Sequence, residues 1–309
     1  MHISDVSQFP ALFKETFAVW SKSKTPRLGA SLAYYTIFAI APLFLLILSL
    51  AGFLFGQEAA RKELFGQVAG LVGAQGRQAI QSIVAAANQP RAGTWATIAA
   101  VVTFTMGATA VFVELQDALN TIWEAKRKAG SGLRHFIKDR LLSFAMVLGI
   151  GFLFLVSLIL NACLAGVGRY ASSFLPEHRL AMAVLNFLLS LGVITVLFAM
   201  IFKVLPDVSI PWRNVWIGAF VTALLFNLGK SLIGLYLGRS STVSVFGAAG
   251  SLVVLLLWVY YSAQILFFGA EFTRVYTDKH RDVPLKTKPD AFSPSTHDLR
   301  QTAGDFKIR

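Results

Sequence analysis

The chain has 309 residues, of which 55% are hydrophobic and only 14% are charged, and its mean hydropathy is +0.62. This composition excludes an ordinary soluble domain, because about a quarter of the residues of such a domain are charged. The formal net charge of +12 is compatible with nucleic-acid binding, but the distribution of the basic residues along the chain offers a simpler cause.

The first 27 residues carry large apolar side chains at helical spacing: Phe9, Leu12, Phe13, Phe17 and Trp20. Charged and polar residues occupy the other faces of this segment. The pattern predicts an amphipathic helix within residues 1–27 that lies at the membrane surface and does not span it. Two placements are equally compatible with the pattern, one in the lipid interface and one against the end of a helix bundle.

Six long stretches between Arg27 and Glu271 are almost free of charge. Each exceeds or approaches the roughly 20 residues that a helix needs to cross a hydrocarbon core of about 30 Å. Their apolar runs lack the alternation of barrel strands, so the sequence predicts an all-α polytopic membrane protein with six spans. The stretches are Leu28–Gln57, Ala92–Val113, Leu141–Gly168, Leu180–Phe202, Asn214–Gly238 and Ser240–Ala270.

The first stretch and the loop that follows it each carry a predicted interruption. Pro42 removes one backbone donor and clashes with the carbonyl of Phe38, which predicts a kink or a break in the first span. Residues 58–90 have a period near 3.6 and predict one or two amphipathic helices on the external side, broken near Gly73 and Gly76.

Acidic residues are absent from the middle of every predicted span. Glu114 and Glu271 lie at the cytoplasmic ends of the second and sixth spans, where pairing with a loop Arg or Lys is the expected role. A carboxylate proton relay is therefore disfavoured.

The fifth span contains the one interior charge, Lys230. Asn227, Lys230, Ser231 and Gly234 share a face of this helix and form the best candidate lining of a polar pathway. At about 1.5 Å per residue from Trp216, Lys230 lies roughly 21 Å along a core of about 30 Å. Its charge then requires snorkelling to the outer interface, capture by backbone carbonyls at a helix break, or contact with an anionic headgroup or solute.

Lys and Arg are concentrated in alternate loops, and therefore on one side of the predicted bundle. The N-terminal segment, the second and fourth loops and the tail together hold 20 of the 28, the other loops hold 7, and Lys230 is the last. This asymmetry predicts that both termini are cytoplasmic. The tail, residues 276–309, is rich in Pro, Ser and mixed charge, which predicts disorder.

Short segments in a fixed order resemble the YihY/BrkB family of bacterial inner-membrane proteins. The similarity covers residues 10–275 and implies six helices in a bacterial inner membrane. The family has also been labelled ribonuclease BN. The segments are Leu32–Tyr35 with Ala41–Pro42, Leu119–Asn120 with Trp123, Arg140–Ser143, Pro206–Asp207, Gly218–Ala219, Tyr236, Phe246–Gly247 with Ser251, Trp258–Ser262 and Gly269–Glu271.

The residues themselves argue against a nuclease. Metal-dependent phosphodiester hydrolysis needs clustered carboxylates or histidines, whereas the five histidines and sixteen acids are scattered. The single cysteine, Cys163, excludes an intramolecular disulfide and a multi-thiolate metal site. The sequence thus predicts no enzymatic activity, no cofactor or metal and no nucleic-acid partner. Membrane lipids are the expected partners, and a homo-oligomer is compatible with the sequence.

Two functions stay open at this stage. One is export or translocation of a small or amphiphilic solute, with anionic solutes and lipids as candidates. The other is a non-transporting envelope or assembly factor that acts through lipid and protein contacts. A continuous polar cavity that reaches Lys230 would favour the first, and a solid apolar bundle would favour the second.

Overall fold

The computed structural model describes residues 9–87, 110–125, 149, 153, 156, 179–239 and 250–280. Every element in these ranges is a helix, which confirms the all-α prediction for this part of the chain. Residues 110–122 are helical as well. The named helices are α1 (Phe9–Lys22), α2 (Thr25–Phe55), α3 (Gln57–Ala87), α6 (Arg179–Val204), α7 (Trp212–Arg239) and α9 (Gly250–Lys279).

Four helices in the described ranges are long and apolar enough to cross a membrane. These spans are Thr25–Phe53, Val184–Val204, Trp212–Ile233 and Gly250–Lys279, and they correspond to the first, fourth, fifth and sixth predicted spans. The second and third predicted spans, Ala92–Val113 and Leu141–Gly168, lie almost wholly outside the described residues. The total of six spans therefore stays a prediction.

The C-terminal boundary of the last span differs from the sequence prediction. The sequence ends the span at Ala270 and begins the tail at residue 276, but α9 continues to Lys279. The helix continues because its polar residues find partners: Asn214 Nδ2 donates to Thr277 Oγ1 at 3.3 Å, and Arg274 pairs with Glu124 at 2.6 Å. The rest of the predicted tail lies outside the described residues.

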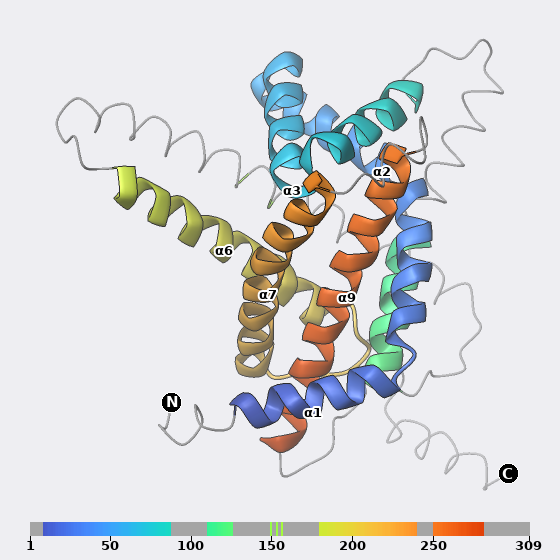
Figure 1. Cartoon of the computed structure of the whole chain (residues 1–309), viewed down its shortest axis with the longest axis vertical. Coiled ribbons are helices and arrows are strands. Elements are labelled where there is room, and N and C mark those ends of the chain that lie inside the picture. Colours follow the sequence, from blue (N-terminus) through green and yellow to red (C-terminus); the bar gives the residue numbers. More distant parts are fainter. Residues whose placement is uncertain are drawn as a thin grey trace, which may run out of the picture.

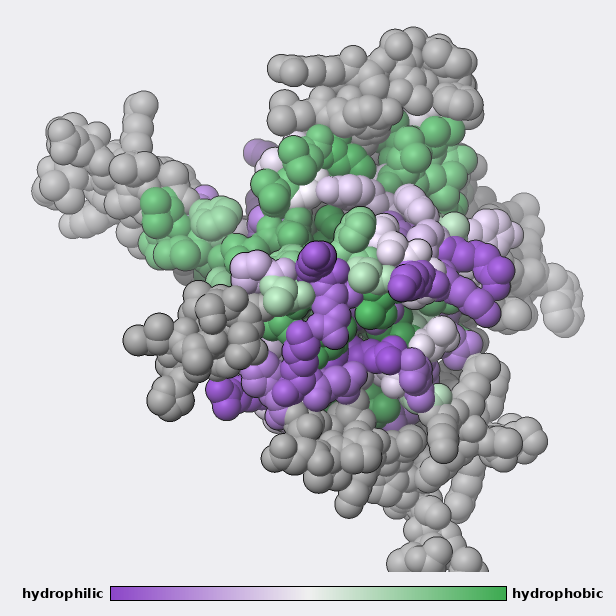
Figure 2. All heavy atoms as spheres, turned by 60° about the horizontal axis from the view of Figure 1, so that its bottom comes forward, coloured by the Kyte–Doolittle hydropathy of each residue, from purple (hydrophilic) through white to green (hydrophobic). Residues whose placement is uncertain are grey.

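Helix α1 lies across one end of the bundle, while α3 lies at the other end (Figure 1). Leu12 of α1 is buried against α7 and α9, and the ring of Phe13 lies 5.2 Å from that of Phe272. An ion pair joins Lys279 of α9 to Glu15 of α1. The amphipathic N-terminal helix thus packs against the bundle. Figure 2, which turns this end forward, shows hydrophilic residues in a band across it and hydrophobic surface beside the band.

The placement of α1 and α3 at opposite ends allows a direct test of topology. In a Cys163→Ser background, Lys62→Cys on α3 should react with a membrane-impermeant maleimide in intact spheroplasts. Lys14→Cys on α1 should react only after permeabilisation, because the charge asymmetry places the basic N-terminal segment in the cytoplasm. Labelling of both cysteines from the same side would contradict the predicted orientation.

The two predicted interruptions have different outcomes. Helix α2 continues through Pro42 from Thr25 to Phe55. The predicted break at this proline is therefore absent, and the predicted kink stays a prediction. One lost backbone donor leaves the hydrogen bonds on either side in place, which is enough to keep a long helix continuous. In α3 the backbone leaves helical geometry at Gly73, where φ is 76° and ψ is 178°. This positive φ favours glycine and folds α3 into two halves.

Helices α7 and α9 pack very closely against each other. Gly218 of α7 faces Thr273 of α9, and Gly269 of α9 faces Thr222 of α7 in a reciprocal arrangement. A Cβ at Gly218 would overlap the Thr273 hydroxyl and lie 2.7 Å from its Cβ. Each threonine hydroxyl donates to a carbonyl of its own helix, Thr222 to Gly218 at 2.6 Å and Thr273 to Gly269 at 2.7 Å. Small residues therefore let these two backbones approach closely.

Candidate functional site

The residues of the predicted polar face all lie on α7, and two of their side chains form hydrogen bonds within this helix. Asn227 Nδ2 donates to the carbonyl of Ala223 at 3.0 Å, and Ser231 Oγ donates to the carbonyl of Asn227 at 3.2 Å. Successive helix residues point about 100° apart. Since Gly229 faces Tyr261 and Ile265 of α9, Asn227 and Ser231 lie on the opposite side of α7.

Lys230 is half-buried in α7. No carboxylate in the described ranges lies within ion-pair distance of its ammonium group. Phe226, one turn earlier on the same face, contacts Phe198 of α6 with ring centroids 5.8 Å apart. Beyond this contact the N-terminal half of α6 points away from α7 (Figure 1). Lys230 lies one turn of α7 beyond the Phe226–Phe198 contact.

A polar network joins the 110–122 helix to the connection between α6 and α7. The side-chain amide of Asn120 forms two hydrogen bonds with Asp207. Its Nδ2 donates to Asp207 Oδ2 at 2.7 Å, and its Oδ1 accepts from the Asp207 backbone N–H at 2.8 Å. Gln116 Nε2 adds a contact of 3.5 Å to the same carboxylate. Asn120 is 8% exposed, so these bonds fix two distant segments inside the protein.

The C-terminal end of α9 holds two charged residues with different surroundings. Arg274 donates to the carbonyl of Ile122 at 2.5 Å and pairs with Glu124 at 2.6 Å. Glu271 is only 2% exposed, and its Oε2 has no hydrogen-bond partner. The predicted pairing of Glu271 with a basic residue is thus absent at this oxygen, because Arg274 is directed to Glu124 and Ile122. Glu114, the other predicted end residue, is half-buried on the 110–122 helix.

Sequence reasoning did not assign a site role to Asn120, Asp207 or Arg274. A signal was present for two of them, since Asn120 and Asp207 lie in the short segments that carry the family resemblance. Arg274 follows the Gly269–Glu271 segment on the next helical turn. What the sequence did not contain was the pairing, because Asn120 and Asp207 are 87 positions apart.

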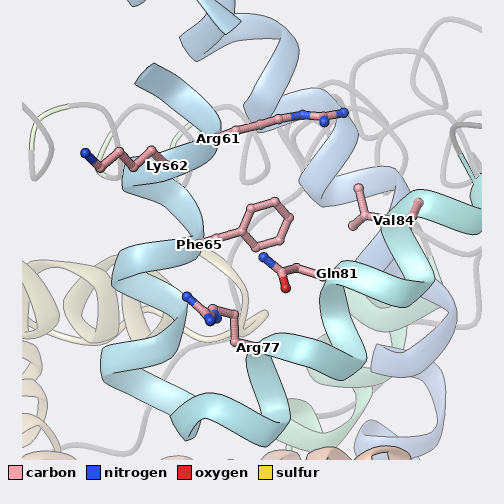
Figure 3. A pocket seen from close by; sticks show the side chains of 7 residues that line it. Arg61, Lys62, Phe65, Arg77, Gln81 and Val84 are labelled. Atoms are coloured by element: carbon pink, nitrogen blue, oxygen red, sulfur yellow. The ribbon is translucent and has the colours of Figure 1, made fainter. Parts of the chain in front are cut away.

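A pocket of about 460 Å³ lies between the two halves of α3. Figure 3 shows Phe65 from the first half and Gln81 from the second pointing toward one another into this space. Arg61 extends across the opening, Arg77 reaches from the second half toward the first, and Lys62 points away. Val84 and Ala85 complete the lining. None of the residues of the predicted polar face contributes to this pocket.

The pocket was also missed by sequence reasoning. Arg61 and Arg77 lie on opposite sides of Gly73 in the sequence, and they line the same pocket because α3 folds at this glycine. The predicted break near Gly73 and Gly76 is the signal that could have found them. Among the described residues, no group of three or more His, Cys, Asp or Glu side chains is arranged to hold a metal ion.

Comparisons with known proteins agree with the motifs. Residues 16–292 match the family described as virulence factor BrkB. The chain is 28% identical over 266 residues to a UPF0761 membrane protein of Alcanivorax borkumensis, which covers 83% of this chain and 58% of that protein. It is 26% identical over 277 residues to one from Pseudomonas paraeruginosa, covering 87% and 62%.

A third relative, the UPF0761 membrane protein YihY of Salmonella typhimurium, is 31% identical over 170 residues, which is 52% of each chain. The chain thus spans less than two thirds of the length of these relatives. No solved structure is significantly similar to it. The resemblance predicted from the short segments is confirmed, and the chain belongs to the BrkB family of membrane proteins.

Proposed function

We propose that this protein translocates a small or amphiphilic anion, with lipids included, across a bacterial inner membrane. In this proposal both termini face the cytoplasm, and the polar face of α7 contributes to the pathway. Lys230 carries the proposal, because it is a half-buried cation within a candidate span that has no carboxylate partner among the described residues. The proposal assigns no enzymatic activity.

A charge inside a bilayer is costly and needs compensation. Helix α7 is continuous from Trp212 to Arg239, so no break in this helix supplies free carbonyls to Lys230. Snorkelling, contact with an anionic headgroup or solute, and carbonyls at a break in another helix stay open as forms of compensation. The half-buried position of Lys230, which has no carboxylate partner among the described residues, supports the second of these.

The alternative function, an assembly factor that works through lipid and protein contacts, also has an observation in its favour. Helix α7 presents an apolar stripe at every fourth position, formed by Trp212, Trp216, Phe220, Leu224, Leu228 and Leu232, all of which are exposed. Such a stripe fits lipid chains or the apolar face of another helix. The tight α7–α9 contact also leaves no passage between those two helices.

The two functions are distinguished by measuring substrate flux across the membrane of proteoliposomes that contain the purified protein. Lys230→Met should fold normally and should lower the flux of an anionic substrate about tenfold or more, because it removes the only interior cation of the polar face. Lys230→Arg should retain part of the flux, since it keeps the charge. Lys14→Met, which removes an exposed cation of α1 outside the candidate spans, serves as the matched control and should transport like the wild type.

Unchanged flux in folded Lys230→Met protein would assign Lys230 to snorkelling and remove it from the pathway. Absence of flux in the wild type for every anionic solute and lipid tested would favour the assembly factor.

A further inference from the structure

We propose that the pocket of α3 binds the phosphate-bearing headgroup of an anionic phospholipid from the adjacent membrane leaflet. This site is separate from the α7 face, and its occupancy can be measured in the absence of transport. The proposal rests on the charge, the lining and the position of the pocket.

The charge of the pocket is uncompensated within the described part of the chain. Arg61 and Arg77 form no ion pair with any described residue. The two carboxylates of α3, Glu58 and Glu63, are exposed, do not line the pocket and pair with no described cation. Two guanidinium groups that reach the opening from opposite halves of α3 therefore create a local excess of positive charge (Figure 3).

The geometry of these groups suits phosphate. Guanidinium presents planar pairs of N–H donors that match phosphate oxygens, and charge-assisted bonds of this kind are about twice as strong as neutral ones. The amide of Gln81 points into the same space and offers a further donor (Figure 3). A pocket of about 460 Å³ is large enough for a headgroup with its glycerol, since ligand pockets span about 300 to 1,000 Å³.

Apart from Lys62, whose side chain points away (Figure 3), the remaining lining is apolar, and this distinguishes a lipid from a free phosphate ion. Phe65, Val84 and Ala85 form the wall of the pocket. The ring of Phe65 stacks on Phe44 of α2 with centroids 6.0 Å apart, so the wall is continuous with a candidate span.

An exposed aromatic side chain precedes α3 along the chain. Phe53, near the end of α2 and just before α3 begins, is 90% exposed. A headgroup held by Arg61 and Arg77 would therefore have hydrocarbon-compatible surface beside it for its acyl chains. An isolated phosphate ion would leave this apolar surface unused.

Native mass spectrometry of the full-length protein tests this assignment. Phosphatidylglycerol and phosphatidylcholine with the same acyl chains are compared as probes, because they differ in net headgroup charge. The wild type should bind phosphatidylglycerol in preference to phosphatidylcholine. Arg61→Gln combined with Arg77→Gln should weaken phosphatidylglycerol binding about tenfold, through loss of charge-assisted bonds, and should reduce the preference for phosphatidylglycerol over phosphatidylcholine.

The matched control combines Lys14→Gln with Lys22→Gln, which removes two exposed cations from α1 at the opposite end of the bundle. This variant should keep the preference for phosphatidylglycerol. All four positions are exposed, so both variants should melt like the wild type. An equal loss of binding in the control would overturn the site, since it would indicate diffuse attraction to net charge. Displacement of phosphatidylglycerol by millimolar inorganic phosphate would overturn the lipid assignment in favour of a free-anion site.

Discussion

Replacement of Gly218 or Gly269 by alanine is expected to destabilise the protein strongly. Alanine ordinarily favours a helix over glycine by about 1 kcal/mol. Here the added Cβ would overlap a threonine hydroxyl on the facing helix and lie 2.7 Å from Thr273 Cβ or 2.8 Å from Thr222 Cβ. Overpacking of this kind costs about 1–3 kcal/mol, which should outweigh the gain in helix propensity. The apparent melting temperature in detergent should fall clearly for both variants.

Gly192→Ala on α6 is the matched control for this prediction, because nothing lies within 4 Å of the position of its Cβ. It should melt at or slightly above the wild-type temperature. The double variant Gly218→Ala, Thr273→Gly should recover part of the loss, since it removes the group that the new methyl meets. If Gly218→Ala melts like Gly192→Ala, the close approach of α7 and α9 is not a determinant of stability.

Asn120→Ala is expected to be the second strongly destabilising change. The substitution would remove the acceptor of the Asp207 backbone N–H and the donor to the Asp207 carboxylate, both at short distances. Leaving a partly buried donor without a partner costs about 1–3 kcal/mol, and more when a charged group is involved. Asn120→Asp should be worse than Asn120→Ala, because it places a second carboxylate beside Asp207.

Thr121→Ala is the control for Asn120→Ala. Thr121 is the next residue on the same helix, is exposed, and bonds only to the carbonyl of Asp117 of its own helix. Its replacement should change the melting temperature little. Equal melting of Asn120→Ala and Thr121→Ala would show that the bridge to Asp207 does not hold the 110–122 helix in place.

Much of the helical architecture was predictable because long apolar stretches and glycine have strong local effects. The spans around Pro42 and Lys230, and the interruption at Gly73, were located from composition and backbone chemistry alone. The continuation of the last helix to Lys279 was not predicted, because Glu271 is the first charge after a long apolar run. In the structure this carboxyl is buried, and the helix continues past it.

The tertiary features were beyond local reasoning. The Asn120–Asp207 bridge and the Arg274–Glu124 pair join residues that are distant along the chain, and the pocket lined by Arg61 and Arg77 brings together the two halves of α3. Their formation depends on how the helices pack and on the direction taken after the fold at Gly73. One sequence contains the residues of these contacts, but it does not specify which of the polar groups meet.

Reconstitution of the purified wild type into vesicles tests the proposal of translocation most directly. The measurement follows the appearance of a fluorescently labelled phosphatidylglycerol, and of a labelled phosphatidylcholine, in the opposite leaflet. The proposal predicts faster movement of the anionic lipid than in protein-free vesicles, faster movement than that of the zwitterionic lipid, and slower movement in Lys230→Met. Two results together, obtained with folded protein present, would contradict the proposal. Both lipids would move at the rates of protein-free vesicles, and small anions enclosed in the vesicles would not leak out.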